Sequence, residues 1–187
     1  MNRREAITAV AWLMGGTLIS AEMLVSCTTK SKDVSDLFKP EQISFLNEVG
    51  DTILPTTNTP GAKAANVGEF MAVMVRDCYT PEDQKIFLEG FDKLNKASDE
   101  KFDKEFMQLN PKQRTDLLTA LDAEQKEHQR TKGPEDPNHY FRMMKELTLL
   151  GYFSSEVGAT QALRYDPVPG RYDGCMPYKK GDRAWAT

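Results

Sequence analysis

Prolines mark the starts of three predicted helices in this chain of 187 residues. Pro40, Pro81 and Pro111 each precede a run in which apolar side chains recur every three or four residues, as they do on one face of a helix. Proline suits the first turn of a helix because the amide hydrogen that it lacks would have no partner there. Thr80, just before Pro81, is a residue type that caps helix N-termini. This pattern predicts a chain divided into amphipathic helices.

The other apolar patterns complete a mainly α fold, which we expect to be one compact multi-helix domain. No stretch alternates apolar and polar residues between hairpin turns, so no β-sheet is expected. The predicted helices are 40–53, ended by the turn Pro55–Gly61; 67–79; a helix from Pro81 with the apolar stripe Ile86, Phe87, Phe91 and Leu94; a shorter element marked by Phe102, Phe106 and Leu109; a helix from Pro111 with Leu117, Leu118 and Leu121 inward; and 139–150, interrupted by Gly151 and Gly158.

The chain changes character after Leu163. Its prolines and glycines are then spaced too closely for a helix or a strand, at Pro167, Pro169, Gly170, Gly174, Pro177 and Gly181. An irregular segment of about 20 residues is uncommon inside a compact domain. This extended, Pro/Gly-rich tail also carries residue types that are enriched in protein interfaces, namely Arg164, Tyr165, Arg171, Tyr172, Tyr178, Arg183 and Trp185. We expect the tail to lie across a partner protein; the alternative is a tail folded back over its own helices.

The N-terminus has the features of an export signal. Arg3 and Arg4 form a positive region, and the apolar run 7–19 that follows them is too short for a comfortable membrane span. Paired arginines before such a run resemble the twin-arginine signal, which exports proteins that are already folded. The alternative is an ordinary charged signal region, because residues 5–7 depart from the usual twin-arginine consensus. Residues 1–26 are therefore predicted to be a signal peptide and not part of the fold.

A lipid-attachment motif ends this predicted signal. The sequence Leu-Val-Ser-Cys at residues 24–27 resembles a bacterial lipobox, whose cysteine, here Cys27, becomes the lipid-bearing first residue of the mature protein. Residues 27–39 are predicted to be a flexible tether, and residues 40–187 the helical domain. Acyl chains contribute about 0.8 kcal/mol for each methylene that they bury, so several chains hold a soluble domain at a membrane. We expect a protein of the periplasm or cell envelope that is lipid-anchored to a membrane.

The composition excludes several classes of function. The formal net charge is −4 and no cluster of lysine and arginine alternates with aromatic residues, so nucleic acid is not expected as a partner. The chain has no glycine-rich phosphate loop, GxSxG elbow, HExxH helix or CxxC pair. His128 and His139 supply too few ligands for a structural metal site. We predict no catalytic, cofactor-binding or metal-ligating residue in this chain.

Two cysteines remain besides Cys27. Cys78 lies at a predicted helix end, and Cys175 lies in the tail. In an oxidising compartment the two could pair with each other, which would staple the tail to the helical body, or Cys175 could bridge to another polypeptide. The sequence leaves both possibilities open.

Three motifs give the chain a resemblance to a known family. They are LLGYFSSEVG at residues 149–158, YDPVPGRYDGC at residues 165–175, and the turn DTILP at residues 51–55 with Pro60-Gly61-Ala62. From about Pro40 to Asp182 the chain resembles the gluconate 2-dehydrogenase subunit 3 family, the small subunits of membrane-associated, flavin-dependent sugar and polyol dehydrogenases.

The resemblance implies a subunit without a catalytic site. FAD and sugar oxidation are expected in a large partner of the glucose-methanol-choline (GMC) oxidoreductase type, with a cytochrome c as a candidate electron acceptor. The small subunit is expected to escort the large one through twin-arginine export and to stay bound, and its lipobox would anchor the complex. The alternative is a stand-alone envelope lipoprotein that acts as a binding module. The docking residues that the resemblance implies are Tyr152, Phe153, Arg164, Tyr165, Pro167, Pro169, Arg171, Tyr172 and Cys175.

Overall fold

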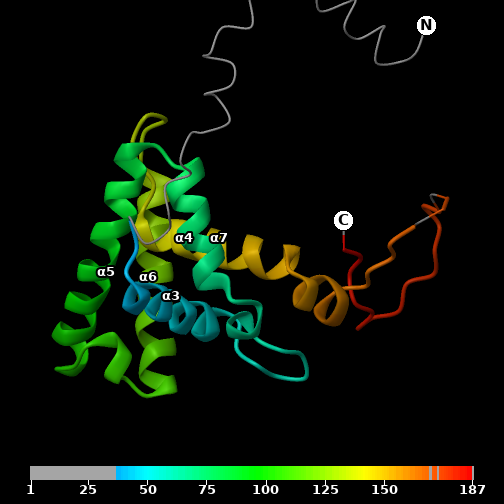
Figure 1. Cartoon of the computed structure of the whole chain (residues 1–187), viewed down its shortest axis with the longest axis horizontal. Coiled ribbons are helices and arrows are strands. Elements are labelled where there is room, and N and C mark those ends of the chain that lie inside the picture. Colours follow the sequence, from blue (N-terminus) through cyan, green and yellow to red (C-terminus); the bar gives the residue numbers. More distant parts are fainter. Residues whose placement is uncertain (1–36, 169, 172, 187) are drawn as a thin grey trace, which may run out of the picture. The chain divides into compact units, whose positions relative to one another are not determined.

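The computed structural model describes residues 37–168, 170–171 and 173–186, which all belong to one unit of the chain. Within these residues the fold is helical, with no strand (Figure 1). The mainly α prediction is confirmed. The α-helices are α3 (Pro40–Ile53), α4 (Val67–Cys78), α5 (Pro81–Phe102), α6 (Pro111–Thr131) and α7 (Tyr140–Ser154), and the shorter elements are the 3₁₀-helices η3 (Ala62–Ala65) and η4 (Phe106–Gln108) and the π-helix η5 (Gly158–Ala162).

Parts of the sequence-based prediction fall outside the described residues. They are the predicted signal peptide with Arg3 and Arg4, the lipid-attachment residue Cys27, most of the predicted tether, and the tail residues Pro169 and Tyr172.

The three prolines do begin helices, as their positions predict. The Thr80 hydroxyl accepts a hydrogen bond from the Asp83 amide at 3.2 Å and so caps α5. At the start of α6, Asn110 Oδ1 accepts from the Gln113 amide at 2.9 Å, while Gln113 Oε1 accepts from the Asn110 amide at 3.1 Å. This reciprocal pair satisfies two amides that helix geometry leaves without partners.

Two helices run further than the sequence pattern indicates. Helix α5 continues to Phe102. It is capped by Asp103, whose φ of 53° is left-handed. Helix α7 passes through Gly151 and ends at Ser154. Gly151 does not interrupt α7; it makes room for α4, because a Cβ atom at this position would lie 2.5 Å from the Phe70 ring. The glycine is a crossing point of two helices and not a helix end.

The helical domain also begins earlier than predicted. Phe38 lies within the range predicted as tether, but it is only 1% exposed. Its ring meets those of Phe87 and Phe91 edge-to-face, at centroid distances of 6.1 and 6.3 Å. Such pairs add stability beyond the burial of apolar area. Phe38 is therefore part of the core of the helical domain.

Helix α7 organises the core. It packs against each of the other four α-helices in the described part of the chain. Met144 and Leu147 lie on its buried side, and Tyr140 closes on α5 at Gly90, where a Cβ atom would lie 2.8 Å from the tyrosine ring. Within the same core, an aromatic group joins the start of the domain to α3, α5 and η4; its members are Phe38, Phe45, Phe87, Phe91 and Phe106.

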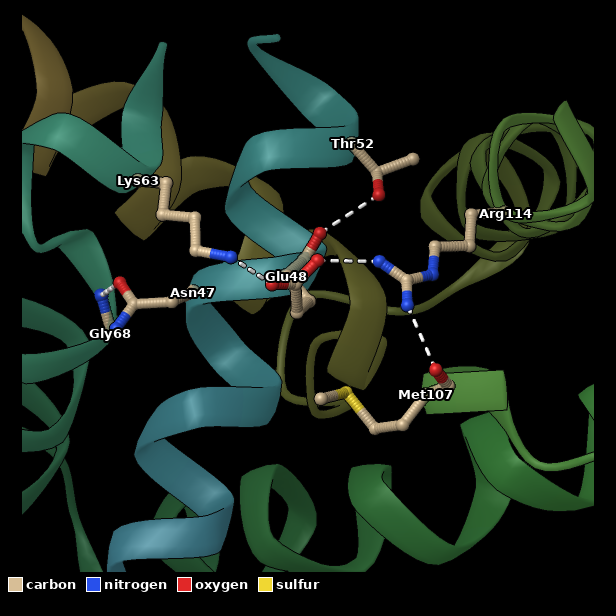
Figure 2. Close-up of polar contacts among 7 residues, drawn as sticks. All are labelled: Asn47, Glu48, Thr52, Lys63, Gly68, Met107 and Arg114. Carbon is tan, nitrogen blue, oxygen red and sulfur yellow. Dashed lines mark hydrogen bonds and ion pairs between the residues drawn. The ribbon is translucent and has the colours of Figure 1, made fainter. Parts of the chain in front are cut away.

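Polar contacts on α3 complete the packing. Figure 2 shows the Glu48 carboxylate between Lys63 of η3 and Arg114 of α6, with an ion pair to each. Arg114 also donates to the Met107 carbonyl at 2.9 Å. The hydrogen bond from Lys63 and that from Arg114 outweigh the effect of burial and lower the pKa of Glu48. One carboxylate thus links α3, η3 and α6, and through Arg114 also η4.

Glu48→Gln should destabilise the fold. The neutral amide removes the negative charge between two cations, and Arg114, only 16% exposed at its side chain, loses its ion-pair partner. We expect the free energy of unfolding to fall by about 1–3 kcal/mol, as for other hydrogen bonds to charged groups. The measurement is urea unfolding followed by circular dichroism. The matched control is Glu89→Gln, which breaks an exposed pair with Lys93 and should cost less than about 0.5 kcal/mol. Equal losses in the two variants would contradict a structural role for the Glu48 contacts.

Candidate partner-docking surface

The second half of α7 exposes large apolar side chains. Leu150 is 52% exposed and Phe153 is 39% exposed. Single exposed apolar residues are normal, but neighbouring ones often mark an interaction site. On α4, Val73 is 38% exposed and lies one helical turn after Phe70, which contacts Gly151. We call Leu150 and Phe153 the α7 patch.

Tyr152, which lies between Leu150 and Phe153 in the chain, faces the other way. It is 4% exposed, and its hydroxyl donates a hydrogen bond to the Pro60 carbonyl at 2.6 Å. This bond fastens α7 to the turn that follows α3. Tyr152 and Phe153 are both expected from the sequence to contact a partner. In the structure Phe153 is exposed at the surface, whereas Tyr152 is buried and supports the fold. We therefore leave Tyr152 out of the docking surface.

A tight turn after α7 leads the chain towards the tail. The Ser155 hydroxyl donates to the Tyr152 carbonyl at 2.6 Å and accepts from the Gly158 amide at 3.0 Å. A Cβ atom at Gly158 would lie 1.9 Å from the Tyr152 carbonyl oxygen, so only glycine fits this turn. The π-helix η5 follows directly.

The tail is a closed loop whose two ends meet. The Arg164 amide donates to the Ala184 carbonyl, and the Ala186 amide donates to the Arg164 carbonyl, both at 2.8 Å. The Arg164 Nε donates to the Arg183 carbonyl at 2.7 Å, and its guanidinium lies 4.5 Å from the Trp185 ring centroid. We call residues 165–184 the C-terminal loop, drawn in orange and red in Figure 1. Its described residues form no helix or strand, and the loop is pinned at its base.

Within the C-terminal loop the carboxylates are engaged by the backbone. Asp166 accepts from the Val168 amide, Asp173 from the Cys175 amide and Asp182 from the Lys179 amide, at 3.1, 3.1 and 2.9 Å. The exposed residues of the loop include the basic side chains Arg171, Lys179 and Lys180 and the apolar side chains Tyr165, Val168, Met176 and Tyr178. The loop therefore offers apolar groups together with exposed side chains of both charges.

The remaining residues assigned to docking from the sequence can now be placed. Tyr165, Pro167, Arg171 and Cys175 are exposed on the C-terminal loop. Arg164 is half-buried at its base, so it positions the loop. Cys78 and Cys175 are both unpaired and exposed. Leu150 is not among the docking residues expected from the sequence, because its three-residue spacing from the buried Leu147 is typical of the inward face; only its 52% exposure in the structure identifies it.

Two classes of feature are not found among the described residues. No group of three His, Cys, Asp or Glu side chains there is placed to hold a metal ion. No helix in the same part of the chain is long and apolar enough to cross a membrane.

Comparison with known proteins gives the family. The family model for gluconate 2-dehydrogenase subunit 3 matches residues 40–170, well over half of the chain. The chain belongs to the gluconate 2-dehydrogenase subunit 3 family. A subunit 3 of this family is a small subunit of a dehydrogenase complex, which implies partnership with a dehydrogenase catalytic subunit. No curated protein and no solved structure matches the chain significantly.

The family match covers all of the described helices but only the first part of the C-terminal loop. It ends at residue 170, whereas the motif resemblance extends to about Asp182. The α7 patch and the base residue Arg164 fall inside the match, and the closing residue Trp185 falls outside it. In this member of the family, a feature beyond the matched region therefore fixes the end of the loop.

Arg164→Ala should open the C-terminal loop. The variant removes the contacts of the guanidinium with the Arg183 carbonyl and the Trp185 ring, so the base keeps its backbone hydrogen bonds and the bond from Arg183 Nη1 to the Gln161 carbonyl at 2.6 Å. We expect chymotrypsin to cut after the exposed Tyr178 several-fold faster, measured by mass spectrometry of timed digests. The matched control is Arg171→Ala, an exposed arginine of the same loop, which should leave the rate unchanged. Equal rates in wild type and both variants would show that the guanidinium does not hold the loop.

Proposed function

We propose that this chain is the non-catalytic small subunit of an FAD-dependent, GMC-type sugar or glycoside dehydrogenase in the cell envelope. In this role it escorts the catalytic subunit through twin-arginine export, stabilises it and anchors it to a membrane. The observation that carries the proposal is the family match over residues 40–170. FAD and the sugar site are assigned to the partner, and a cytochrome c is the candidate electron acceptor.

The α7 patch and the C-terminal loop are proposed to dock on the catalytic subunit. In support, most of the large apolar side chains that the described residues expose lie between positions 150 and 185: Leu150, Phe153, Tyr165, Val168, Met176, Tyr178 and Trp185. Burial of such groups is the main favourable term in protein association. Binding also costs less when a loop is already constrained, and the base contacts of Arg164 constrain this one.

The charges of the loop indicate what kind of surface would receive it. Its aspartates Asp166, Asp173 and Asp182 accept backbone hydrogen bonds, while Arg171, Lys179 and Lys180 are exposed. We infer that the docking site on the catalytic subunit is an apolar surface with charged residues at its rim. Complementary charges of this kind mainly raise the association rate, and salt screens them.

The export role is inferred from the N-terminal sequence. A flavoprotein that has folded around its cofactor cannot pass through a channel for unfolded chains, so it needs a route for folded proteins. A partner that carries the paired arginines Arg3 and Arg4 can supply that route. Lipid at Cys27 would then hold the exported complex at the membrane.

Purification from the native host tests docking directly. The tagged protein, extracted in mild detergent, should bring down a larger partner with a flavin absorbance spectrum. Leu150→Ser and Phe153→Ser should each weaken this association about tenfold, as for central interface residues. The matched control is Met107→Ser: Met107 lies on η4, is 41% exposed and should leave binding unchanged.

The outcomes of this purification separate the two candidate functions. A colourless, monomeric and well-behaved protein would overturn the small-subunit proposal and favour a stand-alone lipoprotein binding module. A flavoprotein complex that is unaffected by both patch variants would keep the proposed function but place its interface elsewhere.

Substitutions in the N-terminal motifs test export and anchoring. Arg3→Lys combined with Arg4→Lys keeps the positive charge but removes the arginine pair, so both this chain and the flavoprotein should stay in the cytoplasm. Cys27→Ser should leave export intact but release the complex into the soluble envelope fraction. Cell fractionation with flavin detection is the measurement. Normal export of the lysine variant would indicate an ordinary signal peptide and no escort role.

A further inference from the structure

A histidine caps the N-terminus of α7. His139 directly precedes the helix, and its Nδ1 accepts a hydrogen bond from the Phe141 amide at 3.3 Å. Caps are usually Ser, Thr, Asp or Asn, whose side-chain oxygens accept hydrogen bonds at any pH near neutrality. An imidazole nitrogen accepts a hydrogen bond only while it carries no proton. The cap of α7 therefore depends on the protonation state of His139.

The second nitrogen of His139 identifies the tautomer. His139 Nε2 lies 3.4 Å from a carboxylate oxygen of Glu124 on α6. Since Nδ1 accepts from Phe141, the single proton of the neutral ring belongs on Nε2, from which it points to Glu124. One imidazole thus joins the start of α7 to α6, and its side chain is only 11% exposed.

The surroundings oppose a second proton on this ring. Burial lowers the pKa of His139, as do His128 and Lys93, whereas Glu124 raises it without reversing the shift. The His128 ring lies 5.7 Å from that of His139, and its Nδ1 is buried without a hydrogen-bond partner. The positive end of the α7 dipole adds a further cost to charge at this position.

A cleft lies beside His139, and the residues that line it are the groups that surround the imidazole. Its volume is about 510 Å³, and it lies between α5, α6 and the segment that precedes α7. The charged and titratable groups lining it are Lys93, Lys96 and Glu100 of α5, Glu124 and His128 of α6, and His139 with Tyr140. Two lysines and a second histidine accompany two carboxylates, of which Glu124 is 64% exposed at its side chain and therefore screened by solvent.

We propose that His139 is a proton-operated cap, which holds the start of α7 against α6 when neutral and releases it when protonated. A second proton goes to Nδ1, where it breaks the hydrogen bond from the Phe141 amide and places a positive charge near His128 and Lys93. Pro137 and Asn138, which line the cleft just before the cap, would move with it. Release would loosen the first turn of α7 and the connection from α6. This inference concerns the fold alone and does not depend on the proposed function.

The direction of the pH effect follows from the lowered pKa. The unfolded chain takes up a proton on this histidine near pH 6.5, and the folded protein does so only at lower pH. The contribution of the cap to stability is therefore complete above about pH 6.5, and it is lost as the pH falls through the lower value of the folded state.

His139→Asn gives the test, because asparagine caps a helix equally well at both pH values. Melting temperatures of the full chain in mild detergent are compared at pH 7.5 and pH 5. Between pH 7.5 and pH 5, the melting temperature of wild type should fall by about 2–4 °C more than that of His139→Asn. This is the shift expected for one cap in a chain of this size. His128→Gln removes the neighbouring ring. In this variant the melting temperature should still fall at low pH, but the midpoint of that fall should lie at a higher pH than in wild type. Equal losses in wild type and His139→Asn would overturn the proposal.

A second measurement needs no variant, so a folding defect cannot obscure it. Hydrogen exchange monitored by NMR reports the protection of single amides in the wild-type chain. The Phe141 amide should lose several-fold more protection between pH 7.5 and pH 5 than the Gln113 amide, which is capped by the neutral side chain of Asn110 at 2.9 Å. Parallel changes in the two amides would contradict a proton-operated cap.

Discussion

The close crossing of α4 and α7 at Gly151 is the contact on which the rest of the structure depends. Because Gly151 has no side chain, the Phe70 ring packs directly against the α7 backbone. The adjacent Tyr152 reaches Pro60 from the same stretch of helix and fixes the turn after α3. With this side of α7 buried, Leu150 and Phe153 remain on its outer side. The packing that builds the core thus also determines which apolar residues of α7 remain exposed.

Apolar burial and ion pairs contribute to this domain in different ways. The aromatic group around Phe87 and the buried side of α7 supply the non-directional hydrophobic term, which drives folding but tolerates small shifts between helices. The contacts of Glu48 with Lys63 and Arg114 are directional and relate α3, η3 and α6 at fixed positions. Arg114 extends this fixed geometry to the Met107 carbonyl of η4.

The hydrogen bonds at the two ends of α7 differ in how they depend on pH. At its C-terminal end, the two hydrogen bonds of the turn from Ser155 to Gly158 are made by the Ser155 hydroxyl, the Tyr152 carbonyl and the Gly158 amide, none of which titrates near neutral pH. At its N-terminal end, the cap is a histidine in contact with a glutamate and close to a second histidine. The hydrogen bonds at the C-terminal end therefore involve no group that titrates near neutral pH, whereas the N-terminal cap is an imidazole.

The sequence by itself determined the helical class and the starts of the helices. Proline at the first turn, with caps such as Thr80, acts over a few residues, so these features are readable locally. The C-terminal loop was also recognisable from its prolines and glycines. Only the tertiary structure decided that Phe38 belongs to the core, that Tyr152 faces inward and that Arg164 and Trp185 close the loop. The physical reason is that these roles depend on contacts between residues far apart in the chain, and local spacing carries no information about such contacts.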